Sequence, residues 1–366
     1  MANRWGVGII GGSTERGWAS AAHIPALRSL PEYEIRAVST RRRASAERSA
    51  RALGITLAFD DHRELLARPE VDIALVSVNV TQHRELALAA IEAGKTVVCE
   101  WPLGKNLAEA EEIAGRAKKR GVKTLIGLQG RFAPAVRYLR DLVADGYIGR
   151  LLGTRIAGAG PDTLWAGVLD LPYEFSADID NGNTLLSIPA AHALEQLSFA
   201  LGDIVSVSST LIARRGQAVR LRDQAIVPMT AHDQVAFSGT LEGGALVSVH
   251  YHGGPVKGPV FVWEVRGTEG EIVLSTEHGY PNISELEIQG GRGDEPSKEL
   301  SIPAEYRLAP PEANGAATNV ASMYVQFARD LAEGTELTPD FDLAVRRHRL
   351  IDAIERANAT GVRQTV

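Results

Sequence analysis

The chain has 366 residues, 45% of them hydrophobic and 23% charged, which is the composition of a globular protein and excludes a disordered or collagen-like chain. Asp and Glu number 45 against 39 Lys and Arg, so a basic surface for nucleic acid is not expected. The lone Cys99 cannot form an internal disulfide, no signal-peptide pattern is visible, and no apolar run reaches the ~20 residues of a membrane span. We therefore expect a cytoplasmic protein of about two domains, without a membrane or nucleic-acid partner.

Short apolar runs alternate with amphipathic helical patterns over the first third of the chain. Strands are expected at residues 7–10, 34–39, 72–78, 96–100 and 122–128, and helices at 20–30, 44–53, 82–93 and 108–119. This alternation predicts βαβ units and a doubly wound parallel sheet.

The pattern changes after a helix expected at 133–145. A helix at 184–201 is followed by strands at 204–213, 233–241, 245–252, 260–266 and 271–275, and by helices at 319–332 and 341–357. Glycine-containing turns at 242–244 and 267–270 predict hairpins, and 289–296 is expected to be an exposed loop.

The fold class expected is therefore α/β. Residues 1–130 are predicted to form a Rossmann domain that binds a dinucleotide. Residues 131–366 are predicted to form an α+β domain for substrate binding and oligomerisation, with an open, largely antiparallel sheet, and its C-terminal helices can pack back on the first domain.

The turn after the first predicted strand is rich in glycine. Glycines at this position let backbone N–H groups and a helix N-terminus approach a pyrophosphate. The candidate cofactor-binding residues of the turn are Gly11, Gly12, Ser13, Gly17 and Trp18. Because the spacing is longer than the usual dinucleotide fingerprint, a strand–helix turn without a ligand is the alternative.

The end of the second predicted strand indicates which dinucleotide would bind. An acidic residue there binds the ribose 2′-hydroxyl of NAD, whereas Arg accommodates the 2′-phosphate of NADP. This chain has Ser39, Arg41 and Arg42 at that place and no carboxylate before Glu47. NADP is therefore preferred as the cofactor and NAD is possible; the alternative is a solvated basic start to the next helix.

Glu100-Trp101-Pro102, at the end of the fifth predicted strand, sharpens this interpretation. With the opening strand and loop, His83 and His192, it gives the chain a resemblance to the Gfo/Idh/MocA oxidoreductase family. The resemblance implies a Rossmann domain, a second α/β domain and oxidation or reduction of sugars and polyols with NAD(P). Asn79, His83, Gln129 and the Glu100–Pro102 turn are the further candidate cofactor-binding residues. At residues 78–80 the chain has Val-Asn-Val where many members of the family have Thr-Pro-Asn, and for His83 the alternative is an ordinary residue of the first helical turn.

Within that family the chain is most similar to the fungal galactose-pathway repressor subgroup. The matching stretches are residues 17–19, 100–103, 128–131, 145–149 and 181–182. His192 follows the last of these at about the length of a helix. Where the family usually has Glu-Lys-Pro with a Lys near the nicotinamide, this chain has Trp101, which cannot titrate. The resemblance therefore supports two functions, a dehydrogenase and a dinucleotide-binding regulator without turnover.

His192, Glu195 and Arg131 are the candidate catalytic residues. Histidine suits proton transfer from a carbinol because its pKa lies near neutrality. Glu195 shares a helix face with His192 and could orient the imidazole, and Arg131 could hold a hydroxyl-rich or anionic substrate. The alternatives are a core histidine at 192 and an interdomain salt bridge at Arg131.

The remaining histidines do not indicate a metal site. His250 and His252 point to one sheet face, where packing or a subunit interface is expected rather than a metal. The leading prediction is a homodimeric or homotetrameric NAD(P)-dependent oxidoreductase for a sugar-like or polyol substrate. The non-catalytic regulator is the second, and a lyase or hydrolase that uses its cofactor transiently is the third.

Overall fold

A computed structural model of the chain describes residues 4–160, 164–257 and 259–366. Two compact units are found, one of the residues up to Gln129 together with Leu308–His348, the other of Gly130–Arg307 and Arg349–Val366. Helix α8 (Ala317–Glu333) therefore belongs to the first unit, and α9 (Phe341–Thr360) begins in the first unit and ends in the second. Within the described ranges, no helix is long and apolar enough to cross a membrane.

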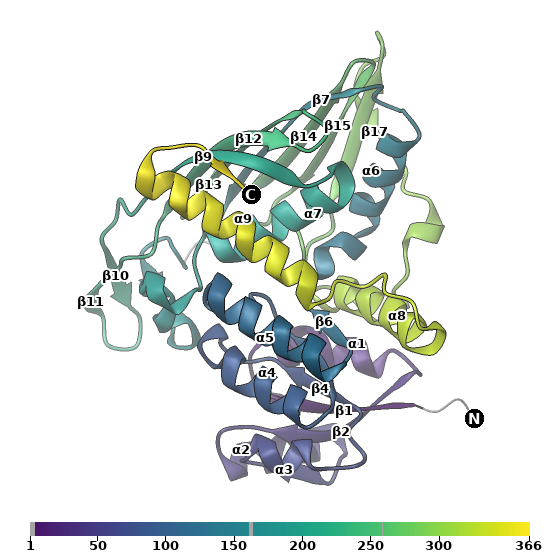
Figure 1. Cartoon of the computed structure of the whole chain (residues 1–366), viewed down its shortest axis with the longest axis vertical. Coiled ribbons are helices and arrows are strands. Elements are labelled where there is room, and N and C mark those ends of the chain that lie inside the picture. Colours follow the sequence, from purple (N-terminus) through teal and green to yellow (C-terminus); the bar gives the residue numbers. More distant parts are fainter. Residues whose placement is uncertain (1–3, 161–163, 258) are drawn as a thin grey trace. The chain divides into compact units, whose positions relative to one another are not determined.

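The first unit contains a six-stranded sheet in the order β3-β2-β1-β4-β5-β6, and every neighbouring pair is parallel. Its strands are β1 (Trp5–Ile10), β2 (Tyr33–Ser39), β3 (Leu57–Phe59), β4 (Ile73–Val76), β5 (Thr96–Cys99) and β6 (Thr124–Ile126). The predicted doubly wound parallel sheet is confirmed (Figure 1). Strand β3 was not expected from the sequence, because three residues carry little periodic signal.

The helical segments of this unit follow the predicted strand–helix alternation. They are η1 (Ala19–His23), α1 (Ile24–Arg28), α2 (Arg43–Leu53), α3 (His62–Leu66), η2 (Val80–Gln82), α4 (His83–Glu92), α5 (Leu107–Arg120) and η3 (Gln129–Phe132), the last of which begins at the unit's end, followed later by α8. The helix expected at 20–30 starts with the π-helical turn η1, and this turn buries His23 completely.

The second unit is built on a nine-stranded sheet in the order β17-β16-β15-β14-β7-β13-β12-β9-β18. Its strands are β7 (Leu151–Ala159), β9 (Ile204–Ile212), β12 (Gln234–Leu241), β13 (Leu246–His252), β14 (Phe261–Gly267), β15 (Gly270–Thr276), β16 (Glu287–Arg292), β17 (Lys298–Glu299) and β18 (Gln364–Thr365). Only β7 and β13 pair in parallel, so the expectation of a largely antiparallel sheet is confirmed.

One local prediction in this sheet is right only in part: residues 293–296 are an exposed loop, whereas residues 289–292 belong to a strand. The loop expected at 289–296 begins inside β16, which pairs with β15 from Gly270↔Arg292 to Ser275↔Glu287. The glycines at 290 and 291 suggested a loop, but they suit this strand because a Cβ on either would meet backbone atoms within 3.1 Å.

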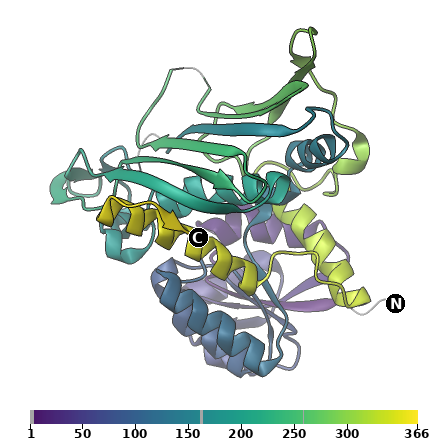
Figure 2. The same ribbon diagram turned by 45° about the horizontal axis from the view of Figure 1, so that its top comes forward.

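Helices lie on one face of the large sheet (Figure 2). The helical segments of this unit are α6 (Pro134–Ala144), η4 (Leu171–Ala177), η5 (Ile179–Asn181), η6 (Leu186–Ala190), α7 (Ala191–Leu201), η7 (Ala304–Tyr306) and the end of α9. On β9, the Ser209 hydroxyl donates to the Ile354 carbonyl of α9 at 2.6 Å, which identifies the helix-covered face. In the part of the unit that the structure describes, the opposite face carries no helix.

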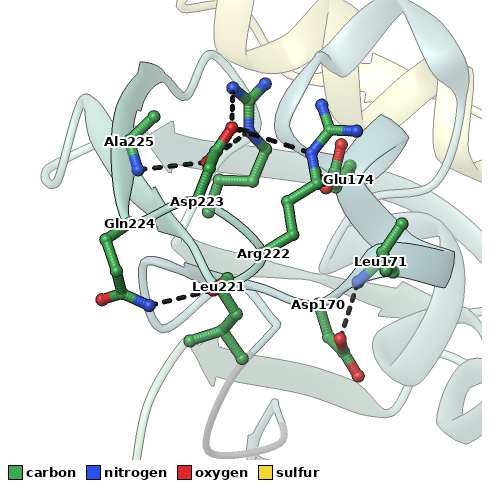
Figure 3. Close-up of polar contacts among 9 residues, drawn as sticks. Asp170, Leu171, Glu174, Leu221, Arg222, Asp223, Gln224 and Ala225 are labelled. Carbon is green, nitrogen blue, oxygen red and sulfur yellow. Dashed lines mark hydrogen bonds and ion pairs between the residues drawn. The ribbon is translucent and has the colours of Figure 1, made fainter.

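A small sheet of β8 (Val168–Leu169), β10 (Gln217–Arg220) and β11 (Ala225–Pro228) stands beside the large one. Its turn is held by ion pairs. The Arg220 guanidinium donates to both carboxylate oxygens of Asp223. Arg222 Nε lies 3.1 Å from Glu174 (Figure 3). Asp170 caps η4 by accepting from the Leu171 N–H at 2.7 Å. Since these charges are exposed or half-buried, they shape the turn more than they stabilise the unit.

Candidate active site

The glycine turn after β1 is packed too closely for side chains. The N–H groups of Gly11 and Gly12 donate to the Ser39 carbonyl at 2.9 and 3.3 Å, and Gly11 has φ +89°. A Cβ on Gly11 would lie 2.2 Å from the Ser77 carbonyl oxygen, and one on Gly12 would lie 2.4 Å from Val38. Packing of the protein's own strands therefore requires glycine at both positions, and they lie at the carboxyl end of β1, where a dinucleotide approaches a parallel sheet.

The rest of the turn contains the other predicted residues. Ser13 donates its N–H to the Gly11 carbonyl at 2.8 Å, and Gly17 has φ +91°. Trp18 packs edge-on against the buried His23, with ring centroids 6.5 Å apart. The structure therefore joins Gly11, Gly12 and Ser13 to Ser39 at the carboxyl ends of β1 and β2, whereas Trp18 lies against His23.

Arg41 and Arg42 are exposed at the start of α2, next to the buried Ser39. Within the described part of the chain neither forms an ion pair, whereas Arg43 binds Glu47 at 3.0 Å. Arg42 occupies the N-cap position without a side-chain cap, at the helix end where a cation is disfavoured. Both guanidinium groups thus remain available to a ligand at this strand end.

Unsatisfied buried polar atoms gather at the same sheet edge. Ser77 Oγ, Gln129 Oε1 and Trp18 Nε1 are buried and have no hydrogen-bond partner among the described residues. Leaving such a group unpaired costs about 1–3 kcal/mol, so a polar ligand that satisfies them is favoured. Together with the bare glycine turn, these atoms fit a dinucleotide, which binds at the carboxyl ends of parallel strands.

The Glu100–Trp101–Pro102 turn follows β5. Glu100 is held by the buried His23, whose Nε2 lies 2.7 Å from Glu100 Oε1. A Cβ on Gly127 would lie 2.4 Å from the same oxygen, so the carboxylate fits against a bare backbone. The Trp101–Pro102 peptide bond is cis. Trp101 is 5% exposed and packs on His348 of α9, with ring centroids 4.8 Å apart.

His348 makes a testable contribution to acid sensitivity. Burial lowers its pKa to about 3, from an ordinary value of 6.5. Between about pH 6.5 and pH 3 the histidine is protonated in the unfolded chain but stays neutral in the folded one. The unfolding free energy of the protein therefore falls as the pH is lowered through this range and is unaffected by His348 above it.

Between pH 7 and pH 5, the unfolding free energy of the wild type should fall by about 2 kcal/mol more than that of His348→Phe. The phenylalanine keeps a ring against Trp101 but cannot take up a proton. Urea unfolding at the two pH values measures this difference. The exposed His278→Phe serves as control and should follow wild type. An equal loss in His348→Phe and wild type would contradict the assignment.

His83 and Asn79 lie next to this turn. His83 is buried at the start of α4, with Nδ1 2.7 Å from the Pro102 carbonyl and Nε2 3.0 Å from the Val78 carbonyl. Burial lowers its pKa, so the ring is neutral. Asn79 is exposed and precedes η2. Because both His83 nitrogens face backbone carbonyls, its clearest contribution is to hold the turn.

In the second unit the structure brings Arg131 and Glu195 together. Arg131 Nε donates to Glu195 Oε1 at 2.8 Å, and its Nη2 contacts the same oxygen. The Glu195 side chain is 1% exposed, and the Arg131 guanidinium also lies over the Phe199 ring at 4.9 Å. His192 is buried on α7, three residues before Glu195. The arginine that sequence reasoning assigned to substrate thus pairs with the glutamate assigned to His192.

Sequence reasoning missed several residues that the structure places at the site. They are His23, Gly127, Tyr324 and His348. Their partners are 27 to 301 residues away in the chain, so no local spacing could reveal the contacts. The adjacency of Gly127 to the Glu100 turn follows from the parallel pairing of β5 and β6.

Comparison with known protein families agrees with this geometry. Residues 5–128 match the sequence profile of the GFO_IDH_MocA oxidoreductase family with an NAD-binding Rossmann fold, and residues 134–276 match the C-terminal domain of Gal80p.

Individual relatives include both enzymes and a regulator. The chain is 30% identical to dehydrogenase aclE of Aspergillus oryzae, over 99% of this chain and 98% of that protein. It is 33% identical to the trans-1,2-dihydrobenzene-1,2-diol dehydrogenase of Bos taurus over 47% of this chain and 53% of that enzyme. The crystal structure of a super-repressor mutant of Gal80p from Saccharomyces cerevisiae superposes with a TM-score of 0.88 at 25% identity, covering 99% of this chain and 98% of that one. The chain therefore belongs to the Gfo/Idh/MocA oxidoreductase family, in a subgroup that resembles Gal80p.

Proposed function

We propose that this protein is an NAD(P)-dependent oxidoreductase that transfers hydride to or from a sugar-like or polyol substrate. The observation that carries the proposal is the set of unsatisfied polar atoms in a parallel-sheet unit whose first strand ends in a glycine turn; two of them, Ser77 and Gln129, follow strands of that sheet. The dinucleotide would supply or accept the hydride. Its pyrophosphate would lie at the Gly11–Gly12 turn. Along the same sheet edge, Ser77 Oγ after β4 could donate to the dinucleotide, and Gln129 Oε1 after β6 could accept a hydrogen bond from it.

The protein's own residues would handle the proton and the substrate. His192 would take the hydroxyl proton during oxidation and return it during reduction. Glu195, held by Arg131 in a buried pair, would orient the neighbouring imidazole through the shared face of α7. Dehydrogenases among the relatives support this reaction type, and the dihydrodiol enzyme, by its name, supports a hydroxyl-bearing substrate.

NADP is the proposed preference, because Arg41 and Arg42 are exposed and unpaired at the end of β2. We expect the double change Arg41→Ala and Arg42→Ala to weaken NADP binding about tenfold or more, since a guanidinium–phosphate contact is a strong charge-assisted hydrogen bond. NAD binding should change less than twofold. Isothermal titration calorimetry with both dinucleotides measures this, and Arg43→Ala, which removes a residue already paired with Glu47, is the control. Equal weakening of both dinucleotides would contradict the preference.

A second function is favoured by Trp101. An indole cannot exchange the proton that the family's usual lysine handles, and the chain resembles Gal80p over both units. The alternative is therefore a dinucleotide-binding regulator without turnover.

A binding and turnover series separates the two functions. The protein is first titrated with NAD, NADP and their reduced forms, and then assayed at 340 nm against a panel of sugars, polyols and diols. Dinucleotide binding with turnover on a panel member supports the enzyme, whereas binding without any turnover supports the regulator. Failure to bind either dinucleotide would contradict both.

We also propose that the chain forms a homodimer or homotetramer through the helix-free face of the large sheet. Ser209 faces α9, so its neighbour Ser208 faces away, and direct pairing continues this row through Ser238 and Ser248 to Arg155. The three serines of this row have small side chains, which let a second copy approach closely. We expect light scattering after gel filtration to give a multiple of the 39.3 kDa chain mass, and Ser238→Lys with Ser248→Lys to reduce it to one chain. A monomeric wild-type protein would contradict this.

A further inference from the structure

Three buried histidines, each from a different helical segment, contact the three residues of the Glu100–Pro102 turn, one histidine to each. His23 at the end of η1 binds the Glu100 carboxylate, His348 of α9 packs on Trp101, and His83 at the start of α4 binds the Pro102 carbonyl. Their exposures are 0%, 3% and 1%, respectively. The turn directly follows the last residue of β5, Cys99, and lies outside any helix or strand.

The hydrogen atoms on His23 follow from its partners. Glu100 can only accept as a carboxylate, so His23 Nε2 must donate to it, across 2.7 Å. Nδ1 lies 2.8 Å from the Tyr324 hydroxyl. Burial raises the pKa of Tyr324 well above its ordinary value, so the phenol keeps its hydrogen and can donate it to Nδ1. Tyr33 in turn donates its hydroxyl hydrogen to the Tyr324 backbone carbonyl at 2.8 Å. A chain of donors therefore runs from α8 through His23 to Glu100.

His83 uses its other ring nitrogen. The neutral ring carries one hydrogen for two carbonyl acceptors, and we assign it to Nδ1, whose contact with the Pro102 carbonyl is 2.7 Å against 3.0 Å from Nε2 to the Val78 carbonyl. His348 contributes its ring face instead, since its Nε2 has no hydrogen-bond partner in the described part of the chain. The three contacts thus differ in kind: an Nε2 donor, an Nδ1 donor and a packed ring.

We propose that His23, His83 and His348 are positioning residues that together fix the Glu100–Trp101–Pro102 turn for dinucleotide binding. The link to the dinucleotide rests on the proposed function, whereas the holding of the turn does not. Trp101 stands where relatives usually have lysine, and it can contribute to the cofactor site only by packing. The turn must therefore be held in one conformation beside the cofactor. The histidines of η1, α4 and α9 hold this conformation, because a three-residue turn has too few contacts of its own to do so.

Crossed amide substitutions test the proposal. The side-chain amide of glutamine reaches about as far as His Nε2, and that of asparagine about as far as His Nδ1. We therefore expect His23→Gln to stay within threefold of wild-type dinucleotide affinity and His23→Asn to weaken it about tenfold. At position 83 the order should reverse, with His83→Asn retained and His83→Gln weakened. At position 348, Phe should be retained and Leu weakened.

A second readout reports on the turn without any ligand. With 5-fluorotryptophan at the five tryptophans, the Trp101 ¹⁹F resonance is assigned by its loss in Trp101→Phe. It should shift or broaden in His23→Asn, His83→Gln and His348→Leu and remain in place in their matched variants. The Trp263 resonance, from the core of the second unit, should stay unchanged throughout and serves as the folding control.

The outcomes are separable. If wild type binds no dinucleotide, the proposed function fails, while the Trp101 resonance still tests the positioning. The proposal would be overturned if the same amide, Asn or Gln, retained dinucleotide affinity at both positions 23 and 83. That result would indicate a general need for polarity or size rather than for a donor at a particular ring nitrogen. An unshifted Trp101 resonance in the three weakened variants would overturn it as well.

Discussion

Replacing Arg131 by Met is expected to lower the unfolding free energy of the second unit by about 3–5 kcal/mol. The physical reason is that Glu195, 1% exposed on α7, would lose its guanidinium partner while its charge stays buried. Urea unfolding followed by the fluorescence of the second unit's tryptophans, Trp165 and Trp263, measures the effect.

Two comparisons make this prediction specific. The exposed pair of Arg292 and Glu269, both 54% exposed, is the matched control, and Arg292→Met should cost less than about 1 kcal/mol. Changing Arg131 and Glu195 together to Met should recover most of the loss, because neither charge of this pair is then left buried without the other. A single Arg131→Met variant as stable as Arg292→Met would show that the buried pair does not stabilise the unit.

Replacing His192 by Ala is expected to lower kcat about 10²- to 10⁴-fold on the substrate that the panel identifies, because proton transfer by a positioned side chain contributes a factor of that size. Dinucleotide affinity should stay within twofold of wild type, since His192 belongs to the second unit and the glycine turn to the first. Stopped-flow hydride transfer and calorimetric titration measure the two quantities.

The control for this experiment is His278→Ala, an exposed histidine of the same unit, which should retain wild-type turnover. His192→Asn, which keeps a hydrogen-bonding side chain but cannot transfer the proton, should be as slow as the alanine variant. Full activity in either His192 variant would remove this residue from the proposed mechanism.

The alternation of strands and helices in the first unit and the hairpin turns in the large sheet of the second were predictable, because each depends on residues that are close together in the chain. Strand β7 was not, although it lies inside the large sheet between β13 and β14. Its sequence, Leu-Leu-Gly-Thr-Arg-Ile-Ala-Gly-Ala, has two glycines that weaken a strand pattern. In the folded unit Gly158 is required, since a Cβ there would lie 2.4 Å from the Tyr251 ring.

The sequence by itself determined the fold class, the glycine turn, the arginines after β2 and the Glu100–Pro102 turn, because short-range patterns of glycine, charge and apolar period encode them. Only the tertiary structure decided which side chains meet. It joined Glu195 to Arg131 across 64 residues and Tyr324 to His23 across 301, and it placed a histidine on each residue of the Glu100–Pro102 turn. Such contacts arise when distant segments are buried together and each buried polar group must find a partner, and no local spacing records that choice.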